Sequence, residues 1–228
     1  MRIAAVALLL SLGLAGAALA QGEEGKLEPA NTNIKNVASL QRGAKYYVNY
    51  CLGCHSAKYV RYNRLAADLG ITEKQLVDNL MFTGEHPYDT MAIAMKPEDA
   101  TRWFGVPPPD LSLIARSRGT DYLYTYLRGF YADPMRPTGV NNIVLRGSAM
   151  PAVLWELQGP QRAVYHEDPK HPGQQVFAGL EQISPGQLSA ADFNDMVRDI
   201  VNFLDYIGEP IKRDREQLGI RVIGFLLV

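Results

Sequence analysis

Hydrophobic and polar positions repeat with helical spacing in four stretches of this chain. In the strongest, near the C-terminus, apolar residues recur at steps of three and four before Gly208 and Pro210. The run Ser189-Ala190-Ala191-Asp192 has the form of a capping box and predicts where this helix begins. We expect the helix to pack on the first helix of the domain. Its apolar positions are Phe193, Met196, Val197, Ile200, Phe203, Leu204 and Ile207.

The first helix is predicted to run from Leu40 to about Cys51, with Ser39 as its N-cap. Ala44 and Val48 continue the spacing set by Leu40, so Cys51 should emerge on the face that turns toward the core. Residues 21–37, which precede this helix, are polar and are expected to be irregular.

Two further helices are predicted between these. Thr72 and Gln75 have the spacing of a capping box and should open the second helix. The third should run from Thr120 to Arg128 and end at Gly129. The apolar positions expected to face inward are Leu76, Leu80 and Met81 in the second helix, and Tyr122, Leu123, Tyr126 and Leu127 in the third.

Long segments rich in Pro and Gly separate the helices, including 106–109 and 133–186. Strand patterns are weak, although Ala163–Tyr165 and Gln175–Phe177 could pair as a short hairpin. The pattern predicts an all-α fold with long loops. Because long ordered loops need a function or a ligand to pack on, we expect a cofactor within them.

Both ends of the chain depart from the pattern of a folded domain. Residues 1–20 have the form of an export signal, with Arg2, an apolar run and the small-residue site Ala18-Leu19-Ala20. Residues 21–217 then form the domain, and 218–228 are apolar. A membrane-spanning helix needs about 20 apolar residues, so we interpret 218–228 as the truncated start of a C-terminal transmembrane anchor. A short amphipathic tail packed on the domain is the alternative.

Charge gives no sign of a nucleic-acid partner, because the formal net charge of the 228 residues is only −1. The two cysteines carry more information, since both lie in Cys51-Leu52-Gly53-Cys54-His55. This spacing allows two thiols to bond the edge of a haem while the next residue, His55, becomes the proximal iron ligand. Both thiols are then used, so no disulfide is expected.

A CxxC pair has other uses, which the rest of the chain disfavours. A zinc site needs about four ligands, usually with a second closely spaced pair, and His86, His166 and His171 do not form one. A thioredoxin-like redox pair would be expected in a βαβ context, which is missing from the pattern. A plain disulfide is the remaining alternative to haem attachment.

The sixth iron ligand decides the chemistry, because an occupied position leaves only electron transfer and an open one permits an enzyme or a sensor. Met150 is the best candidate, since Gly147-Ser148-Ala149 lets the backbone approach a ring and Pro151 fixes the chain direction after it. A thioether ligand raises the haem potential. The weaker candidates are Met91, Met95 and Met135 in loops, Met81 and Met196 at core spacing, and His86 in a bis-His site.

Haem carries two propionates, which need partners when they are half-buried. Arg116 and Arg118 follow the proline-rich turn and are candidates, because the guanidinium fork suits a carboxylate. They would lie on the same side of an extended chain but on different faces of a helix.

These motifs together resemble the cytochrome c1 family, the haem subunits of ubiquinol:cytochrome c oxidoreductase. The resemblance spans nearly the whole chain after residue 20. The matching segments are CxxCH preceded by Tyr46, Tyr47 and Tyr50, then PPPDLSLIARSRGTDYLYTYLRGFY, RPTGVNN, GSAMP and DFNDMVRDIVNFLDYIGEP. Two departures are the apolar end at Val228 and a compact AMP segment compared with mitochondrial relatives.

The resemblance implies one covalent haem c with His55 and Met150 as axial ligands, Arg118 at a propionate and Tyr122 near the haem. It implies a non-catalytic redox subunit that takes an electron from a Rieske iron-sulfur protein and passes it to a soluble cytochrome c. The expected assembly is a dimeric complex with cytochrome b in the cytoplasmic membrane, with the haem domain on the periplasmic side. Candidate docking acids are the pairs Glu98 and Asp99, and Glu167 and Asp168.

Two other functions stay open at this point. The chain could be a cytochrome subunit of another periplasmic dehydrogenase or oxidase. It could instead be a haem enzyme or sensor, such as a peroxidase or gas binder, if no side chain closes the sixth position.

Overall fold

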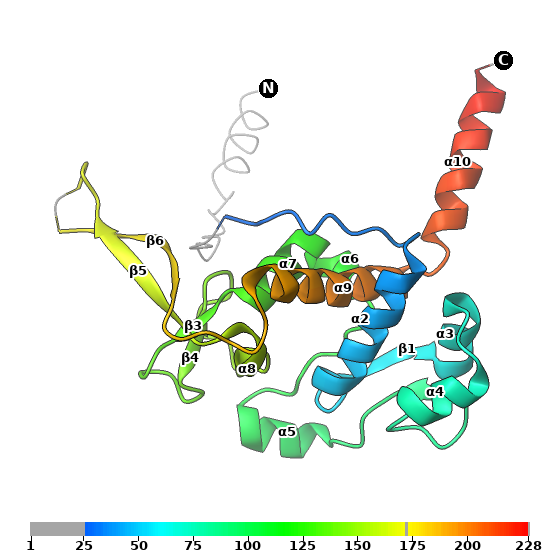
Figure 1. The fold of residues 1–228 in the computed structure, drawn as a ribbon, viewed down its shortest axis with the longest axis horizontal. Helices are drawn as coiled ribbons and strands as arrows, with labels where there is room; N and C mark the ends of the chain where they lie inside the picture. The colour runs from blue at the N-terminus through cyan, green and yellow to red at the C-terminus, as the bar shows by residue number, and fades with distance from the viewer. Residues whose placement is uncertain (1–25, 172, 228) are drawn as a thin grey trace, which may run out of the picture.

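Two long helices cross at the centre of the molecule in the computed structural model, which describes residues 26–171 and 173–227 (Figure 1). They are α2 (Val37–Tyr50) and α9 (Ala190–Gly208), and they pack on each other as expected. The expected export signal at 1–20 lies outside the described residues. The core holds Tyr47, Phe203 and Ile200, which are almost fully buried.

A glycine allows the close approach of these two helices. A Cβ atom at Gly43 would lie 2.1 Å from the carbonyl oxygen of Asp199 and 2.7 Å from Cβ of Phe203. Since real Cβ atoms do not come this close to backbone, only a hydrogen fits at position 43. The apolar faces of both helices can therefore interlock without a gap.

The N-cap of α2 differs from the expected one. The helix begins at Val37, and the side chain of Asn36 accepts a hydrogen bond from the backbone N–H of Ser39. Ser39 is already inside the helix, where its buried hydroxyl donates to Asp199 at 2.6 Å. The prediction of Ser39 as the cap was wrong because that hydroxyl serves a contact with α9, which local sequence does not reveal.

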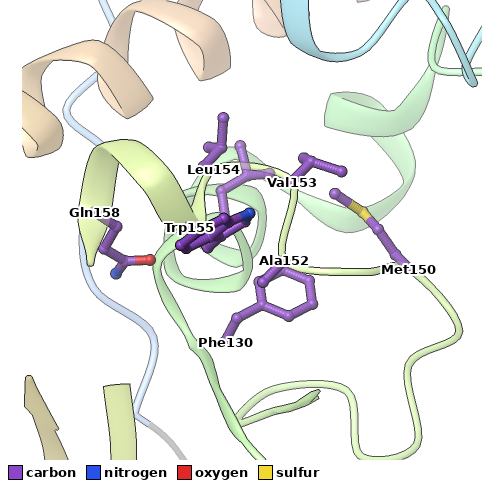
Figure 2. Close-up of a pocket in the computed structure, with 8 residues that line it drawn as sticks. Phe130, Met150, Ala152, Val153, Leu154, Trp155 and Gln158 are labelled. Carbon is purple, nitrogen blue, oxygen red and sulfur yellow. The ribbon is translucent and has the colours of Figure 1, made fainter. Parts of the chain in front are cut away.

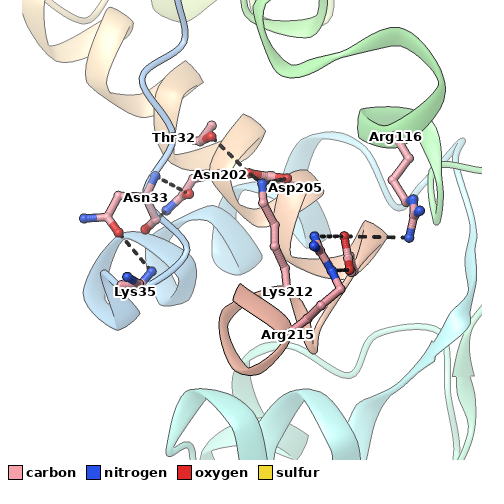
Figure 3. Close-up of polar contacts among 9 residues, drawn as sticks. Thr32, Asn33, Lys35, Arg116, Asn202, Asp205, Lys212 and Arg215 are labelled. Atoms are coloured by element: carbon pink, nitrogen blue, oxygen red, sulfur yellow. Dashed lines mark hydrogen bonds and ion pairs between the residues drawn. The ribbon is translucent and has the colours of Figure 1, made fainter. Parts of the chain in front are cut away.

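A polar stripe along α9 binds the segments that flank it (Figure 3). Asn202 is buried and holds the backbone of Asn33 through both of its amide atoms, at 2.9 and 3.0 Å. One turn further on, Asp205 accepts hydrogen bonds from Thr32 and from Lys212, each at 3.0 Å. The segment before α2 and the segment after α9 are thus fixed to the same helix.

The other predicted helices form close to their expected positions. Helix α7 (Thr120–Arg128) has the predicted ends and is followed by Gly129. Its most buried large side chains are Leu123 and Tyr124, whereas Tyr122 and Tyr126 are half-buried. Helix α4 (Glu73–Asn79) starts at the predicted capping box of Thr72 and Gln75, but ends before Leu80 and Met81.

Among the described residues, three two-stranded antiparallel sheets and several short helices lie within the predicted loops. The expected hairpin is confirmed and is longer than predicted, since Tyr165 pairs with Phe177 within a ladder that extends from Gln161 to Glu167. The described chain is mainly helical, as expected, and contains more strand than the one predicted hairpin. The sheets are β1 (Ala57–Arg61) with β2 (Thr90–Met91), β3 (Phe130–Ala132) with β4 (Val140–Asn142), and β5 (Gln161–Glu167) with β6 (Gln175–Gln182). The added helices are α3 (Tyr62–Leu69), α5 (Pro97–Phe104), α6 (Ile114–Arg118) and α8 (Trp155–Gln158).

Helix α10 (Lys212–Leu226) projects from the domain at the far end of the chain (Figure 1). It begins before the apolar segment expected at 218–228, and Phe225 and Leu226 are 80% and 74% exposed. Because Phe225 and Leu226 are exposed, this end of the chain is not packed on the domain, as the alternative prediction required. Within 26–171 and 173–227, the structure contains no helix that combines the length and hydropathy needed to cross a membrane.

Candidate functional site

The end of α2 presents the CxxCH residues in a tight turn. Cys51 is the C-cap of the helix, and its carbonyl oxygen accepts hydrogen bonds from the N–H groups of Cys54 at 3.0 Å and His55 at 2.8 Å. The buried hydroxyl of Tyr47 donates to the carbonyl of His55 at 2.7 Å. This turn therefore holds both thiols and the imidazole together at one end of the helix.

The ring of His55 is held in one tautomer by the proline-rich segment. Its Nδ1 lies 2.8 Å from the carbonyl oxygen of Pro109. Since a carbonyl oxygen can only accept, Nδ1 must carry the proton, which leaves the lone pair of Nε2 available for a metal. Burial lowers the pKa of His55, although the bond to Pro109 opposes this shift. A neutral imidazole is the form that binds iron.

The two cysteines are both free thiols, so the disulfide alternative does not describe this structure. Cys51 is buried and Cys54 is half-buried. Burial raises the pKa of the Cys51 thiol to about 12, with a smaller contribution from Cys54. No cluster of three or more His, Cys, Asp or Glu residues able to hold a metal was found in the part of the chain that the structure describes.

Met150 lines a small apolar pocket between the end of α7 and α8 (Figure 2). Its neighbours there include Phe130, Val153 and Trp155, and its sulfur lies toward Val153 in the close-up. Leu127 and Leu154 also line the pocket. An uncharged, half-buried thioether in such surroundings has the chemistry of a haem ligand.

The weaker candidates for the sixth ligand have other surroundings. Met91 is fully buried in β2 and belongs to the main core, whereas Met135 is 88% exposed in a turn. Met95 is half-buried in the segment before α5. His86 stacks on Tyr88 at 4.9 Å between ring centroids, as part of a loop turn.

Arg118 and Tyr122 are brought together, and a chain of contacts connects them to the Met150 loop. The guanidinium carbon of Arg118 lies 5.6 Å from the centre of the Tyr122 ring. Tyr122 stacks on Tyr126 at 6.1 Å, and the Tyr126 hydroxyl lies 2.8 Å from that of Ser148. Arg118, Tyr122 and the loop that carries Met150, all predicted from the sequence, are thus connected by one continuous set of contacts.

Arg116 points elsewhere, since α6 is helical and places the two arginines on different faces. Its guanidinium (Figure 3) lies 3.8 Å from Glu209 at the end of α9. Its stem packs beside Gly208. Of the two propionate candidates, only Arg118 is adjacent to Tyr122 in this way.

The cytochrome C1 family model matches residues 32–228, which is most of the chain. The chain belongs to the cytochrome c1 family. It is 50% identical to cytochrome c1 of Allochromatium vinosum over 92% of this chain and 86% of that protein. It is 44% identical to a Nitrosomonas europaea protein named ammonia monooxygenase gamma subunit, over 96% of this chain and 89% of that one.

More distant members are also similar along most of the chain. The mitochondrial cytochrome c1 haem protein of Neurospora crassa is 26% identical over 81% of this chain and 56% of that protein. Membership of the cytochrome c1 family implies a c-type haem, and the chain is accordingly a haem electron-transfer subunit.

The described residues fit such a haem in their donor chemistry. Two unpaired thiols, one imidazole with a fixed tautomer and one thioether in an apolar pocket are the groups that c-type attachment and axial ligation require. A further donor is Nε of Arg136, which is buried without a hydrogen-bond partner near the Met150 loop. A carboxylate of a bound group would satisfy that nitrogen.

Sequence reasoning missed several residues that shape this site. The Pro109 carbonyl orients His55, while Arg136 and Asn141 both bond the backbone of Gly147. In the sequence, Pro109 lies in the quoted PPPDLSL segment and Arg136 and Asn141 lie in RPTGVNN, but both segments served as marks of the family and gave these three residues no role.

Proposed function

We propose that this chain carries electrons through one haem c, bound covalently by Cys51 and Cys54, from a Rieske iron-sulfur protein to a soluble cytochrome c. His55 and Met150 are the proposed axial ligands. The single observation that carries this assignment is the fixed imidazole tautomer beside the two free thiols. When bound, the haem supplies a reversible one-electron couple, and the protein sets its potential and access.

The surrounding residues favour electron transfer over substrate chemistry. The Pro109 carbonyl keeps the imidazole oriented and makes it a stronger donor. The apolar residues around Met150 suit ligation by its thioether, which favours ferrous iron and a high potential. With both axial positions filled by side chains, small molecules are kept from the iron.

Arg118 is the proposed propionate partner, with Tyr122 beside it. Their mutual contact at 5.6 Å supports this role, as does the link from Tyr122 through Tyr126 to Ser148. Arg116 is better explained by its contact with Glu209.

We further propose that the chain works in the cytoplasmic membrane with cytochrome b and a Rieske protein, in a dimeric complex. One relative, from Candida albicans, is named as a subunit of a cytochrome b-c1 complex, which supports this assembly. The exposed apolar residues of α10 support anchoring through 218–228. The proposal also places the haem domain on the periplasmic side, after removal of the export signal at 1–20.

Carbon monoxide binding to the reduced protein tests the sixth ligand. We expect no change in the visible spectrum of the wild-type protein and a clear shift for Met150→Ala, because removing the thioether opens the iron. Met135→Ala is the matched control, since this methionine is 88% exposed. Ready binding by the wild-type protein would contradict the proposal and favour an enzyme or sensor.

The partners are tested by purifying the full chain from its native membrane. Copurification of a cytochrome b and a Rieske protein is expected. Recovery of a different set of subunits would favour another complex, an outcome that the name of the Nitrosomonas relative makes worth testing.

Charge reversal at two sites tests the docking of the soluble cytochrome. Glu98 and Asp99 lie on α5, where Asp99 is already paired with Arg102, and Glu167 and Asp168 lie at the end of β5. Loss of salt-dependent electron transfer after reversal of one pair would identify the docking surface. An unchanged salt dependence for both pairs would argue against docking through these acids.

A further inference from the structure

The RPTGVNN motif holds the loop that carries Met150. We infer that Arg136 and Asn141 are positioning residues for the sixth iron ligand, because they fix both sides of the Gly147 peptide backbone. The inference rests on the proposed function, since it concerns ligation by Met150. It assigns a physical role to a motif that the electron-transfer proposal leaves unexplained.

Gly147 is fixed through both of its polar backbone groups. Its carbonyl oxygen accepts a hydrogen bond from Nη2 of Arg136 at 3.0 Å, and its N–H donates to Oδ1 of Asn141 at 2.8 Å. The next residue, Ser148, is held by the hydroxyl of Tyr126 at 2.8 Å. Three side chains therefore fix the two residues that precede the Ala149-Met150 dipeptide.

Arg136 lies in the turn between β3 and β4, and Asn141 lies in β4 just after it. Asp133 receives the N–H of Arg136 at its carbonyl and the side-chain amide of Asn141 at its carboxylate, at 3.1 and 2.9 Å. Asn142 is fully buried and donates to the carbonyl of Tyr126 at 2.8 Å. Because of this last bond, the turn is joined to α7, whose end helps to line the Met150 pocket.

Packing alone does not hold this loop. Residues 145–147 are exposed, and the residues just before them, Ile143 and Val144, belong to a small cluster whose third buried member is Tyr131. Gly147 has φ +75°, and a Cβ atom there would lie 3.3 Å from Nη2 of Arg136. The close bond from Arg136 and the left-handed backbone both suit glycine at this position.

An added ligand such as imidazole competes with Met150 for the iron, so loosening the loop should let the added ligand bind more tightly. The test measures imidazole binding to the oxidised full-length haem protein, together with the weak long-wavelength absorption band of a thioether-bound ferric haem. We expect Arg136→Gln, which loses one hydrogen bond to Gly147, to strengthen imidazole binding by about 5-fold. Asn141→Ala also loses its bonds to Asp133 and to the Asn142 N–H, and should strengthen imidazole binding at least as much. The band should also disappear at a lower temperature in both variants.

Matched controls separate this effect from general damage to the fold. Arg162→Gln and Asn79→Ala remove exposed residues whose bonds lie within the β5–β6 hairpin and α4, and they should leave imidazole binding unchanged. Arg136→Lys retains a donor and should fall between Arg136→Gln and the wild-type protein. Far-ultraviolet circular dichroism checks that each variant is folded, and the comparison uses only the folded fraction.

The outcomes distinguish the two proposals. If the wild-type protein shows the thioether band and the Arg136 and Asn141 variants bind imidazole as the wild type does, the positioning role is wrong and the electron-transfer proposal stands. If the wild-type protein lacks the band and Met150→Ala changes nothing, the proposed ligand itself is wrong. A variant whose imidazole binding strengthens only in proportion to its unfolded fraction would likewise contradict the positioning role.

Discussion

The two sides of the site are built in different ways. His55 and the two cysteines extend from α2, which is packed against α9 over a continuous buried core. Met150 lies on a loop whose position depends on hydrogen bonds from Arg136, Asn141 and Tyr126. One side is fixed by packing between helices, and the other by a small number of polar bonds.

This difference determines how substitutions should act. A change in the α2–α9 contact alters a large buried area, so it should affect the stability of the whole domain. A change in the loop removes one bond of about 1 kcal/mol, so it should alter ligation at the iron before it alters folding. The following predictions test that contrast, beginning with the largest effect.

Gly43→Ala should destabilise the domain the most. The new Cβ would lie 2.1 Å from the carbonyl oxygen of Asp199, which is backbone and cannot turn away. Overpacking typically costs about 1–3 kcal/mol, and we expect a loss of at least about 3 kcal/mol here. The measurement is the free energy of unfolding in urea. Gly219→Ala in α10 is the control, because nothing lies within 4 Å of its Cβ, and its stability should not fall.

Asp199→Ala should cost less, about 2–3 kcal/mol. The buried carboxylate of Asp199 accepts hydrogen bonds from Ser39 and Arg42, and its removal leaves the Ser39 hydroxyl with fewer partners. Arg42 is half exposed and can turn to water, which limits the cost. Asp195→Ala is the control, since its bond to Arg198 is exposed. Equal unfolding free energies for Asp199→Ala and Asp195→Ala would show that the α2–α9 contact stabilises the domain no more than an exposed ion pair does.

Tyr126→Phe should give a smaller loss of stability and a clear change at the haem. The variant loses the bond to Ser148 and keeps the ring stacked on Tyr122. We expect about 1 kcal/mol in the urea titration and stronger binding of added imidazole. Tyr59→Phe, at a residue that is 76% exposed, should change neither quantity. If Tyr126→Phe lost stability without any change in imidazole binding, the claim that hydrogen bonds to the Met150 loop act on the iron ligand would be wrong.

The smallest predicted effect is in acid, at the joint between α9 and α10. The pKa of Glu209 is lowered, chiefly by its hydrogen bond from Arg215, with Arg116 and Lys212 contributing and burial opposing. The stabilisation that ionised Glu209 gives to the fold is therefore complete above its ordinary pKa near 4.5. It is lost as the pH falls through the lower pKa that Glu209 has in the folded protein. The protection of the amides at the start of α10 against hydrogen exchange, relative to the intrinsic exchange rate at each pH, should fall below that range. Glu209→Gln should remove the pH dependence, and an identical acid response in this variant would contradict the assignment.

Local sequence rules predicted the elements whose signals lie within the element itself. Both ends of α7 and the capping residues Thr72 and Ser189 are as expected, because a cap bonds the backbone two or three residues away. The same rule failed at Ser39, whose hydroxyl is used by Asp199, far along the chain. The strands β3 and β4 were missed because each has only three residues.

The candidate site divides in the same way. The CxxCH motif carries its own geometry, so its residues could be named from the sequence, and Met150 followed from small neighbours and Pro151. The partners of those residues could not be named. Pro109 approaches His55 from 54 positions away, and Arg136 reaches Gly147 across a turn that no periodicity predicts. Roles that depend on contacts between distant segments need the folded chain.

Trp155 gives the Met150 pocket its own optical probe. The chain has two tryptophans, and Trp155 lines this pocket whereas Trp103 lies on α5. Haem quenches the fluorescence of a nearby indole by energy transfer, so the emission of Trp155 in a Trp103→Phe background would follow the distance between α8 and the cofactor. Opening of the loop could then be timed in the unlabelled protein, during reduction or on mixing with a partner.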